Sequence, residues 1–274
     1  MKIDEILRKY SNKVNSKWSI ALKVLPLGIL IFVLKFLSHR YGLEIMELNA
    51  LFTTLVAGTI FLLGFLITGV LTDYKESEKI PSELSASIRT LFDDTYTILK
   101  VKNTQTAIEF IEYQKSFVSS LTDWFFKKER TKAILKKISL MNDFFIEFDK
   151  EGVQANYIIK MKNEQNSIRK MILRIDTIRN TDFVNSAYAI VEVMFYLITI
   201  GLIITKIEPF YASLFFTILV TFLISYMFFL IKDLDNPFDY SVNGESGTEI
   251  SLKPIHDIET ELNDFIQNYP SSMS

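Results

Sequence analysis

Long apolar segments constrain this chain more than any other feature of its sequence. Residues 51–72 form a run of 22 residues without a charge, which corresponds to about 33 Å of α-helix at ~1.5 Å per residue. Residues 210–231 form a second uncharged run, and residues 183–205 are apolar apart from a few polar groups and one acid, Glu192. Such lengths match the hydrocarbon core of a bilayer. We predict a transmembrane helix in each of these segments.

A fourth apolar segment, residues 19–37, is interrupted by Lys23 and Lys35. Both lysines lie near the ends of the segment, where a long side chain can extend its ammonium group to the lipid headgroups. A secretory signal peptide is the alternative, but the apolar part begins deep in the chain and no small-residue cleavage site follows it. We therefore predict an all-α integral membrane protein with four transmembrane helices.

The short connections arrange these spans as two helical hairpins. Residues 38–50 join the first pair of spans, and residues 206–209 join the second pair. An even number of spans places both termini and the intervening residues 73–182 on one side of the membrane. Positive charges gather before the first span on that side, whereas the opposite connections offer only Arg40 and Lys206. The positive-inside rule therefore predicts a multi-pass protein of the inner or plasma membrane with both termini in the cytoplasm.

Three segments lie outside the predicted spans. Residues 73–182 carry apolar residues at helical spacing, which predicts a cytoplasmic helical domain whose charges form a solvated face. Residues 1–18 alternate apolar and basic faces, and a helix in the membrane interface or a helix packed on the cytoplasmic domain fits this pattern equally well. Residues 232–274 form a cytoplasmic tail with one short amphipathic helix near residues 255–265.

Composition narrows the possible functions. The 274 residues, 49% of them hydrophobic, include no cysteine and only two distant histidines, and their formal net charge is −2. The lack of cysteine excludes disulfides, thiolate metal sites and a cysteine nucleophile. A nucleic-acid binder usually shows a strong basic excess. We therefore predict no catalytic residues, no metal site and no cofactor, with the lipid bilayer and small inorganic ions as partners and no nucleic acid.

The second span carries the most informative pattern. At 100° per residue, seven of its residues fall within an arc of roughly 100°. They are Thr54, Ala57, Gly58, Phe61, Phe65, Thr68 and Thr72. If several copies of this helix surround an axis, the threonines line wet vestibules, and Phe61 and Phe65 form a hydrophobic constriction that gates by dewetting. Plain helix packing explains the pattern equally well, because Gly and Thr are common at membrane helix contacts.

Acidic residues in and beside the spans are further candidates. Glu192 lies about 14 Å into its predicted span at ~1.5 Å per residue, where an acid is costly enough to suggest a function. It could bind a proton or a cation, but we favour a structural pair with Lys23, Tyr188 or a neighbouring subunit. Asp73 and Glu76 would border the cytoplasmic mouth of a pore. A ring of Asp73 would favour cations, although interleaved lysines weaken that inference.

Two short motifs and their order resemble a known family. The second span contains Leu63-Gly64-Phe65 and continues into Asp73-Tyr74-Lys75-Glu76-Ser77-Glu78. The fourth span is followed by a motif made of Asp235, Asn236, Pro237 and Phe238. In these motifs and in topology, the chain resembles the bestrophin-like membrane proteins, a prokaryotic branch related to the bestrophin channels.

The resemblance implies a homopentamer whose second helices line a central pore with an apolar neck. Phe61 and Phe65, with Ala57 a turn earlier, occupy the matching neck positions. The sequence departs from bestrophins around residues 74–79, where the usual aromatic and basic residues are absent. It also lacks the acidic run that builds the calcium clasp of animal bestrophins, since Asp239 stands nearly alone. We therefore do not expect calcium gating.

These observations leave one leading function and two alternatives. The leading hypothesis is an oligomeric, bestrophin-like channel that passes small ions through a phenylalanine-lined neck. The first alternative is a non-conducting membrane scaffold or signalling protein that acts through its cytoplasmic helical domain. A secondary transporter that uses Glu192 is weaker, because no inverted repeat is visible. An enzyme is not expected, because no nucleophile, base and orienting group recur at a recognised spacing.

Overall fold

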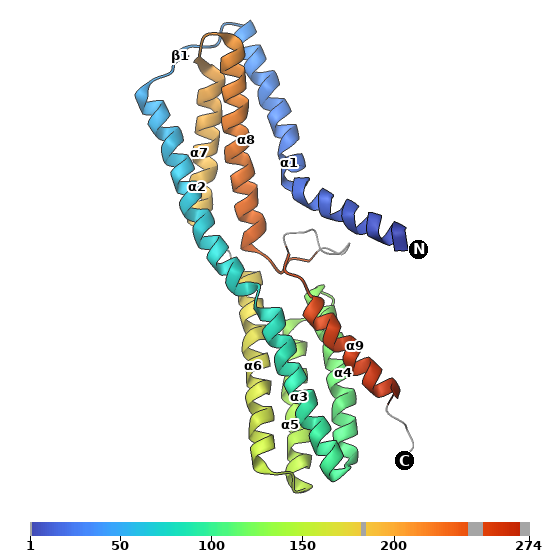
Figure 1. The fold of residues 1–274 in the computed structure, drawn as a ribbon. Coiled ribbons are helices and arrows are strands. Elements are labelled where there is room, and N and C mark those ends of the chain that lie inside the picture. The colour runs from blue at the N-terminus through green and yellow to red at the C-terminus, as the bar shows by residue number, and fades with distance from the viewer. Residues whose placement is uncertain (1, 182–184, 241–248, 269–274) are drawn as a thin grey trace. The chain divides into compact units, whose positions relative to one another are not determined.

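Helices make up almost all of the described chain (Figure 1). The computed structural model describes residues 2–181, 185–240 and 249–268, with side chains from Trp18 onward except at residue 185. The elements in chain order are α1 (Lys2–Arg40), β1 (Met46–Glu47), α2 (Ala50–Ser77), α3 (Ile80–Lys102), α4 (Gln105–Phe125), α5 (Thr131–Lys150), α6 (Ala155–Asn180), α7 (Asn185–Ile204), β2 (Thr205–Lys206), α8 (Phe210–Asp235) and α9 (Lys253–Asn268).

The chain divides into two compact units. The membrane unit comprises residues up to 74 and residues 182–237, and thus contains α1, most of α2, α7 and α8. The bundle unit comprises residues 75–181 and the described residues from 238 onward, and thus contains α3 to α6 and α9. Within the described residues, four helical stretches, in α1, α2, α7 and α8, are long and apolar enough to cross a membrane. The predicted fold class, an all-α protein with four transmembrane helices, is confirmed.

Helix α1 is longer than the predicted span 19–37. It runs without a break from Lys2 to Arg40, so the stretch 1–18 and the span 19–37 belong to one helix. Neither glycine nor proline stands near residue 18, and the sequence there offers no signal for a helix end. Pro26 lies inside the helix, within its apolar part.

The core of the membrane unit lies where α2, α7 and α8 meet. Leu63 and Val70 of α2, Val191 of α7 and Ile224 of α8 are buried in one cluster. Since lipid tails are as apolar as these side chains, close packing rather than release of water must hold the helices together. Small residues at the contacts therefore allow the helices to approach one another closely.

Gly201 on α7 shows how close this packing is. A Cβ atom added at Gly201 would lie 2.3 Å from Cε2 of Phe52, the ring of α2 that covers it. Phe52 is itself fixed at the start of α2, because its backbone N–H donates to Oδ1 of Asn49 over 2.8 Å. The missing side chain of Gly201 thus creates the space that receives the Phe52 ring.

The connections between the spans are joined by a short parallel pair of strands. Met46 of β1 pairs with Thr205 of β2, and Glu47 pairs with Lys206. The pair links the α1–α2 connection to the α7–α8 connection. Strand β1 ends two residues before Asn49, which precedes the first turn of α2.

The bundle unit has an aromatic core. The largest fully buried side chains of α4 and α5 are Trp124, Phe110, Phe117, Phe125, Phe145 and Phe148. Burying a side chain of this kind contributes roughly 1.5–3 kcal/mol. Helix α9, the amphipathic helix predicted in the tail, packs against α3 and α4 through its buried Ile255, Ile258 and Leu262.

We predict that Gly201→Ala destabilises the protein by about 1–3 kcal/mol, because the new methyl group overpacks the Phe52 ring. Denaturation of the purified protein, followed by circular dichroism, measures the effect. Gly28→Ala on α1 is the matched control, since no atom lies within 4 Å of a Cβ added there. Adding Phe52→Leu to Gly201→Ala should recover part of the loss. Equal losses in the two alanine variants would contradict this account of the α2–α7 contact.

Candidate pore-lining site

The seven residues of the predicted arc on α2 are all exposed on the chain. Phe61 and Phe65 expose 77% and 70% of their surface, while Leu63 and Val70 on the other side of the helix expose 1% and 0%. The exposed set also includes Thr54, Ala57, Gly58, Thr68 and Thr72. One face of α2 therefore holds the membrane unit together, and the opposite face is left open.

The hydroxyl groups on this open face are bonded within α2 itself. Thr54 donates to the carbonyl oxygen of Ala50 over 2.8 Å, and Thr68 donates to Gly64 over 2.8 Å. Thr72 donates in the same way to Thr68 over 2.9 Å. Their hydrogens are thus satisfied, while the oxygens remain available as acceptors. The face presents acceptor oxygens towards both ends and two aromatic rings between them.

A cavity adjoins the open face where α2 borders α7. Its volume is about 420 Å³. The residues that line it are Leu51, Thr54, Leu55, Gly58, Thr59 and Leu62 of α2 and Met194 of α7. A Cβ atom added at Gly58 would have no neighbour within 4 Å. No side chain of the described chain therefore covers the α2 backbone at Gly58.

The two acids predicted at a pore mouth lie in different units. Asp73 is exposed near the end of the membrane unit's part of α2. Glu76, in the bundle unit, forms an ion pair with Arg174 of α6 at 3.2 Å. Both side chains of that pair are about half exposed, so the pair contributes little to stability.

Glu192 has a partner that sequence reasoning did not name. Its carboxylate lies 3.0 Å from the ammonium group of Lys232 on α8. Lys23, one of the partners considered from the sequence, instead lies 3.5 Å from Asp233. Two successive residues at the end of α8 thus form ion pairs with α7 and with α1.

Lys35 does not extend to the lipid headgroups as we expected. Its side chain is fully buried, and its ammonium group lies 2.7 Å from Oε1 of Glu44. It also donates to the carbonyl oxygens of Thr205 at 2.6 Å and Ile203 at 3.3 Å. The carbonyls at the end of α7 lack partners within their helix, so a lysine close by satisfies them and its own charge at once.

Glu44 connects this lysine to the end of α1. Its second carboxylate oxygen lies 2.8 Å from Nδ1 of His39, and the His39 ring stacks on Phe210 with centroids 3.9 Å apart. Burial raises the pKa of Glu44, but hydrogen bonds and charges from His39 and Lys35 outweigh it and hold that pKa below its ordinary value. Glu44 therefore stays ionised at neutral pH and balances the charge of Lys35.

The motif after the fourth span divides between the units. Asp235 is the last residue of α8 and Asn236 is its C-cap. Phe238 is fully buried in the bundle unit beside Phe125, with ring centroids 6.4 Å apart. Two residues further on, the Tyr240 hydroxyl donates to the carbonyl oxygen of Ile250 over 2.6 Å.

Arg179 completes this aromatic cluster and was missed from the sequence. Its guanidinium lies 4.5 Å from the centre of the Trp124 ring and donates to the carbonyl oxygens of Trp124 and Phe125 at 3.2 and 2.8 Å. Burial lowers the pKa of Arg179, although a guanidinium stays charged in proteins. The end of α4 is thus capped by a cation from α6.

The described residues contain no cluster of three or more His, Cys, Asp or Glu side chains that could hold a metal ion. The chemistry that the spans offer is instead an open face of rings and hydroxyl groups. Together with four apolar spans, that face characterises a multi-pass membrane protein of the all-α class.

Comparison with solved structures specifies the class further. A bacterial bestrophin homologue from Klebsiella pneumoniae superposes with a TM-score of 0.74 at 17% sequence identity, covering 91% of this chain and 100% of that chain. A point variant of a bestrophin homologue from the same organism gives the same score and identity, with 91% and 99% covered. A variant described as a membrane protein gives 0.73 at 17% identity, with 92% and 99% covered.

The chain therefore has the fold of the bacterial bestrophin homologues over nearly its whole length, which confirms the resemblance at the level of the fold. No protein-family model matches the sequence, and no curated protein matches it. The fold was thus detectable through the order of spans and motifs and through the backbone, rather than through residue identity.

We predict that Glu44→Gln destabilises the protein by about 3–5 kcal/mol, because it leaves the buried Lys35 without its carboxylate. In the unaltered protein, the lowered pKa of Glu44 means that its contribution is complete above the ordinary carboxyl pKa. That contribution is lost as the pH falls below the ordinary carboxyl pKa and through the lowered pKa of Glu44 in the folded protein. Denaturation across this pH range measures both effects.

Glu208→Gln is the matched control, since Glu208 is 76% exposed and pairs with Lys206 in the other connection at 2.7 Å. It should change stability little. The double variant Lys35→Met, Glu44→Gln should recover most of the stability, because it removes both buried charges. A Glu44→Gln protein as stable as the Glu208→Gln protein would show that the pair is not needed.

Proposed function

We propose that this chain is the subunit of an oligomeric ion channel of the bestrophin-like kind, in which α2 from each copy lines a central pore. Phe61 and Phe65 form the hydrophobic neck, with Ala57 beside them. Thr54 and Gly58 lie on one side of the neck, and Thr68 and Thr72 lie on the other. The observation that carries this proposal is the open face of α2.

The contrast between α2 and α8 supports a wet environment for that face. Helix α8 buries its serine and threonine hydroxyl groups and exposes large apolar side chains, as expected of a helix in contact with lipid. Thr217 and Thr221 expose 0% and 1% of their surface, whereas Phe215 exposes 59%. Helix α2 has the opposite arrangement near its ends, where threonines and a bare glycine are exposed. Water or a second helix suits such a surface better than lipid does.

One α2 helix cannot enclose a pore, so several copies are required. The resemblance implies five copies, arranged around an axis with the open faces inward. Two rings per copy would then meet at the neck, where a dewetted constriction blocks ions until it widens. The cavity beside Gly58 leaves room for a neighbouring helix to approach the α2 backbone.

The proposal includes an orientation. The basic residues before the first span place both termini and the bundle unit in the cytoplasm. The Lys35–Glu44 pair then lies at the outer ends of the spans. Asp73 and Glu76 lie towards the cytoplasmic mouth. The membrane concerned is the inner or plasma membrane of the cell.

We predict that Phe61→Ala together with Phe65→Ala raises ion flux several-fold, because small side chains allow the neck to stay wet. Ion efflux from proteoliposomes measures the flux, and mass measurement of the detergent-solubilised oligomer checks assembly from the 31.8-kDa chain. Phe215→Ala is the matched control, since this ring is exposed on α8. It should leave the flux unchanged.

Two outcomes would refute the channel. A monomer in detergent and in nanodiscs would do so, because a single open face cannot surround a path. An assembled oligomer without flux in the unaltered protein and in the double variant would favour the alternative, a membrane scaffold that acts through its bundle unit.

A further inference from the structure

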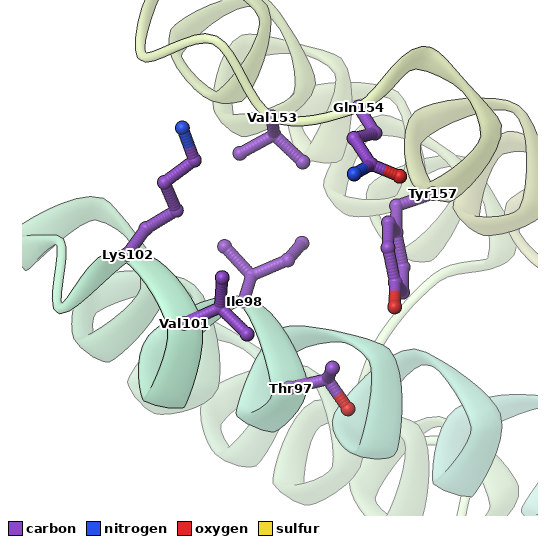
Figure 2. Close-up of a pocket in the computed structure, with 7 residues that line it drawn as sticks. All are labelled: Thr97, Ile98, Val101, Lys102, Val153, Gln154 and Tyr157. Atoms are coloured by element: carbon purple, nitrogen blue, oxygen red, sulfur yellow. The ribbon is translucent and has the colours of Figure 1, made fainter.

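A small cavity lies inside the bundle unit, between the end of α3 and the start of α6 (Figure 2). Its volume is about 150 Å³. The residues that line it are Thr97, Ile98, Val101 and Lys102 of α3, Val153 and Gln154 of the α5–α6 connection, and Tyr157 of α6. This cavity is unrelated to the open face of α2 and has no part in the proposed conduction.

The cavity combines an apolar floor with a polar rim. Ile98 and Val153 form the floor and expose only 3% and 7% of their surface. Figure 2 shows Lys102 on one side of the opening, and Gln154 and Tyr157 on the other. A few polar groups around an apolar floor are typical of small-molecule sites.

The three polar side chains on the rim have no partners of their own among the residues that the structure describes. The ammonium group of Lys102 lies in no ion pair there. The Gln154 amide and the Tyr157 hydroxyl form no hydrogen bond with the side chains or backbone of the described residues. Gln154 is also the N-cap residue of α6, and its side chain makes no capping hydrogen bond. The Lys102 and Gln154 groups are therefore free to bind a molecule in the cavity.

The charges around the cavity favour an anion. Asp94, one turn before Thr97 on α3, is already paired with Lys160 at 2.8 Å. Glu151, beside the α5–α6 turn, accepts a hydrogen bond from Thr106 over 2.5 Å. Lys102 forms no ion pair with either carboxylate in the described chain, so its ammonium group at the rim is available to an anion. The start of α6 adds the partial positive charge of a helix N-terminus.

We propose that this cavity binds a short-chain monocarboxylate. The carboxylate pairs with Lys102 and accepts a hydrogen bond from the Gln154 amide, and the Tyr157 ring borders the site. The aliphatic tail lies on Ile98 and Val153. A cavity of this volume holds the equivalent of about five water molecules, which suits an acid of about four carbons. The site is independent of conduction, so it stands or fails separately from the channel.

Butyrate is the probe, added to the full-length protein in detergent and followed by ligand-observed NMR. Saturable binding of butyrate is expected, with weaker binding of acetate, which leaves the apolar floor uncovered. Butylamine has the same tail and the opposite charge, and should not bind. No saturable binding of butyrate, or equal binding of butylamine, would overturn the proposal.

Variants at the rim locate the site. Lys102→Met should raise the Kd for butyrate at least about tenfold, because a charge-assisted hydrogen bond is lost. Val101→Asp, at a side chain that is 75% exposed, should also weaken binding by adding a negative charge at the opening. Lys100→Met is the matched control, because Lys100 lies over the Tyr96 ring on the same helix and does not line the cavity. Equal Kd values for the Lys102→Met and Lys100→Met proteins would place binding elsewhere and refute the site.

Discussion

A bilayer offers no water to polar groups, so a charge or hydroxyl in a span must find its partner within the protein. Several contacts of the membrane unit follow this constraint, although the buried hydroxyls of Thr199, Ser213 and Thr217 have no hydrogen-bond partner among the described residues. Lys35 is enclosed by Glu44 and by carbonyl oxygens at the end of α7. Glu192 meets Lys232, and Thr221 turns its hydroxyl to a carbonyl one turn back in α8. Each of these contacts ties one span to another or hides a polar group, so they determine how the four helices can pack.

The open face of α2 is informative because of the same constraint. Its threonines satisfy their own hydrogens, yet they remain exposed when every helix of the chain is in place. In lipid, such a surface gains nothing over an apolar one. The proposed channel uses this surface of acceptor oxygens, an uncovered glycine and two phenylalanine rings one turn apart as the lining of an axis shared by several copies. The arrangement of polar groups, more than the count of apolar ones, therefore distinguishes α2 from the other spans.

Local features of the sequence predicted the helices, whereas contacts between residues far apart in the chain could not be predicted. Apolar length identified the four spans, and helical spacing identified both the Phe61/Phe65 face and the tail helix α9, because these signals lie within one segment. The burial of Lys35 could not be predicted, since its partners Glu44 and Thr205 come from two different connections. Arg179 was missed for a similar reason, because α6 brings it to the end of α4 from 55 residues away. The ends of α4 and α7 leave backbone carbonyl oxygens without partners in their own helices. A search for basic residues able to cap such oxygens is the signal that could have identified Lys35 and Arg179.

The segment after α8 bears on what could open such a channel. Animal bestrophins have an acidic run directly after the motif that follows the fourth span, whereas Asp239 of this chain is followed by Tyr240 and is paired with Lys127. Phe238 and Tyr240 hold the segment to the bundle unit through buried rings. In the described stretch 236–240, Asp239 supplies the sole carboxylate, and Lys127 already engages it. The lack of calcium gating therefore stays a prediction for the proposed channel, and in the described structure this segment attaches its buried rings to the bundle unit.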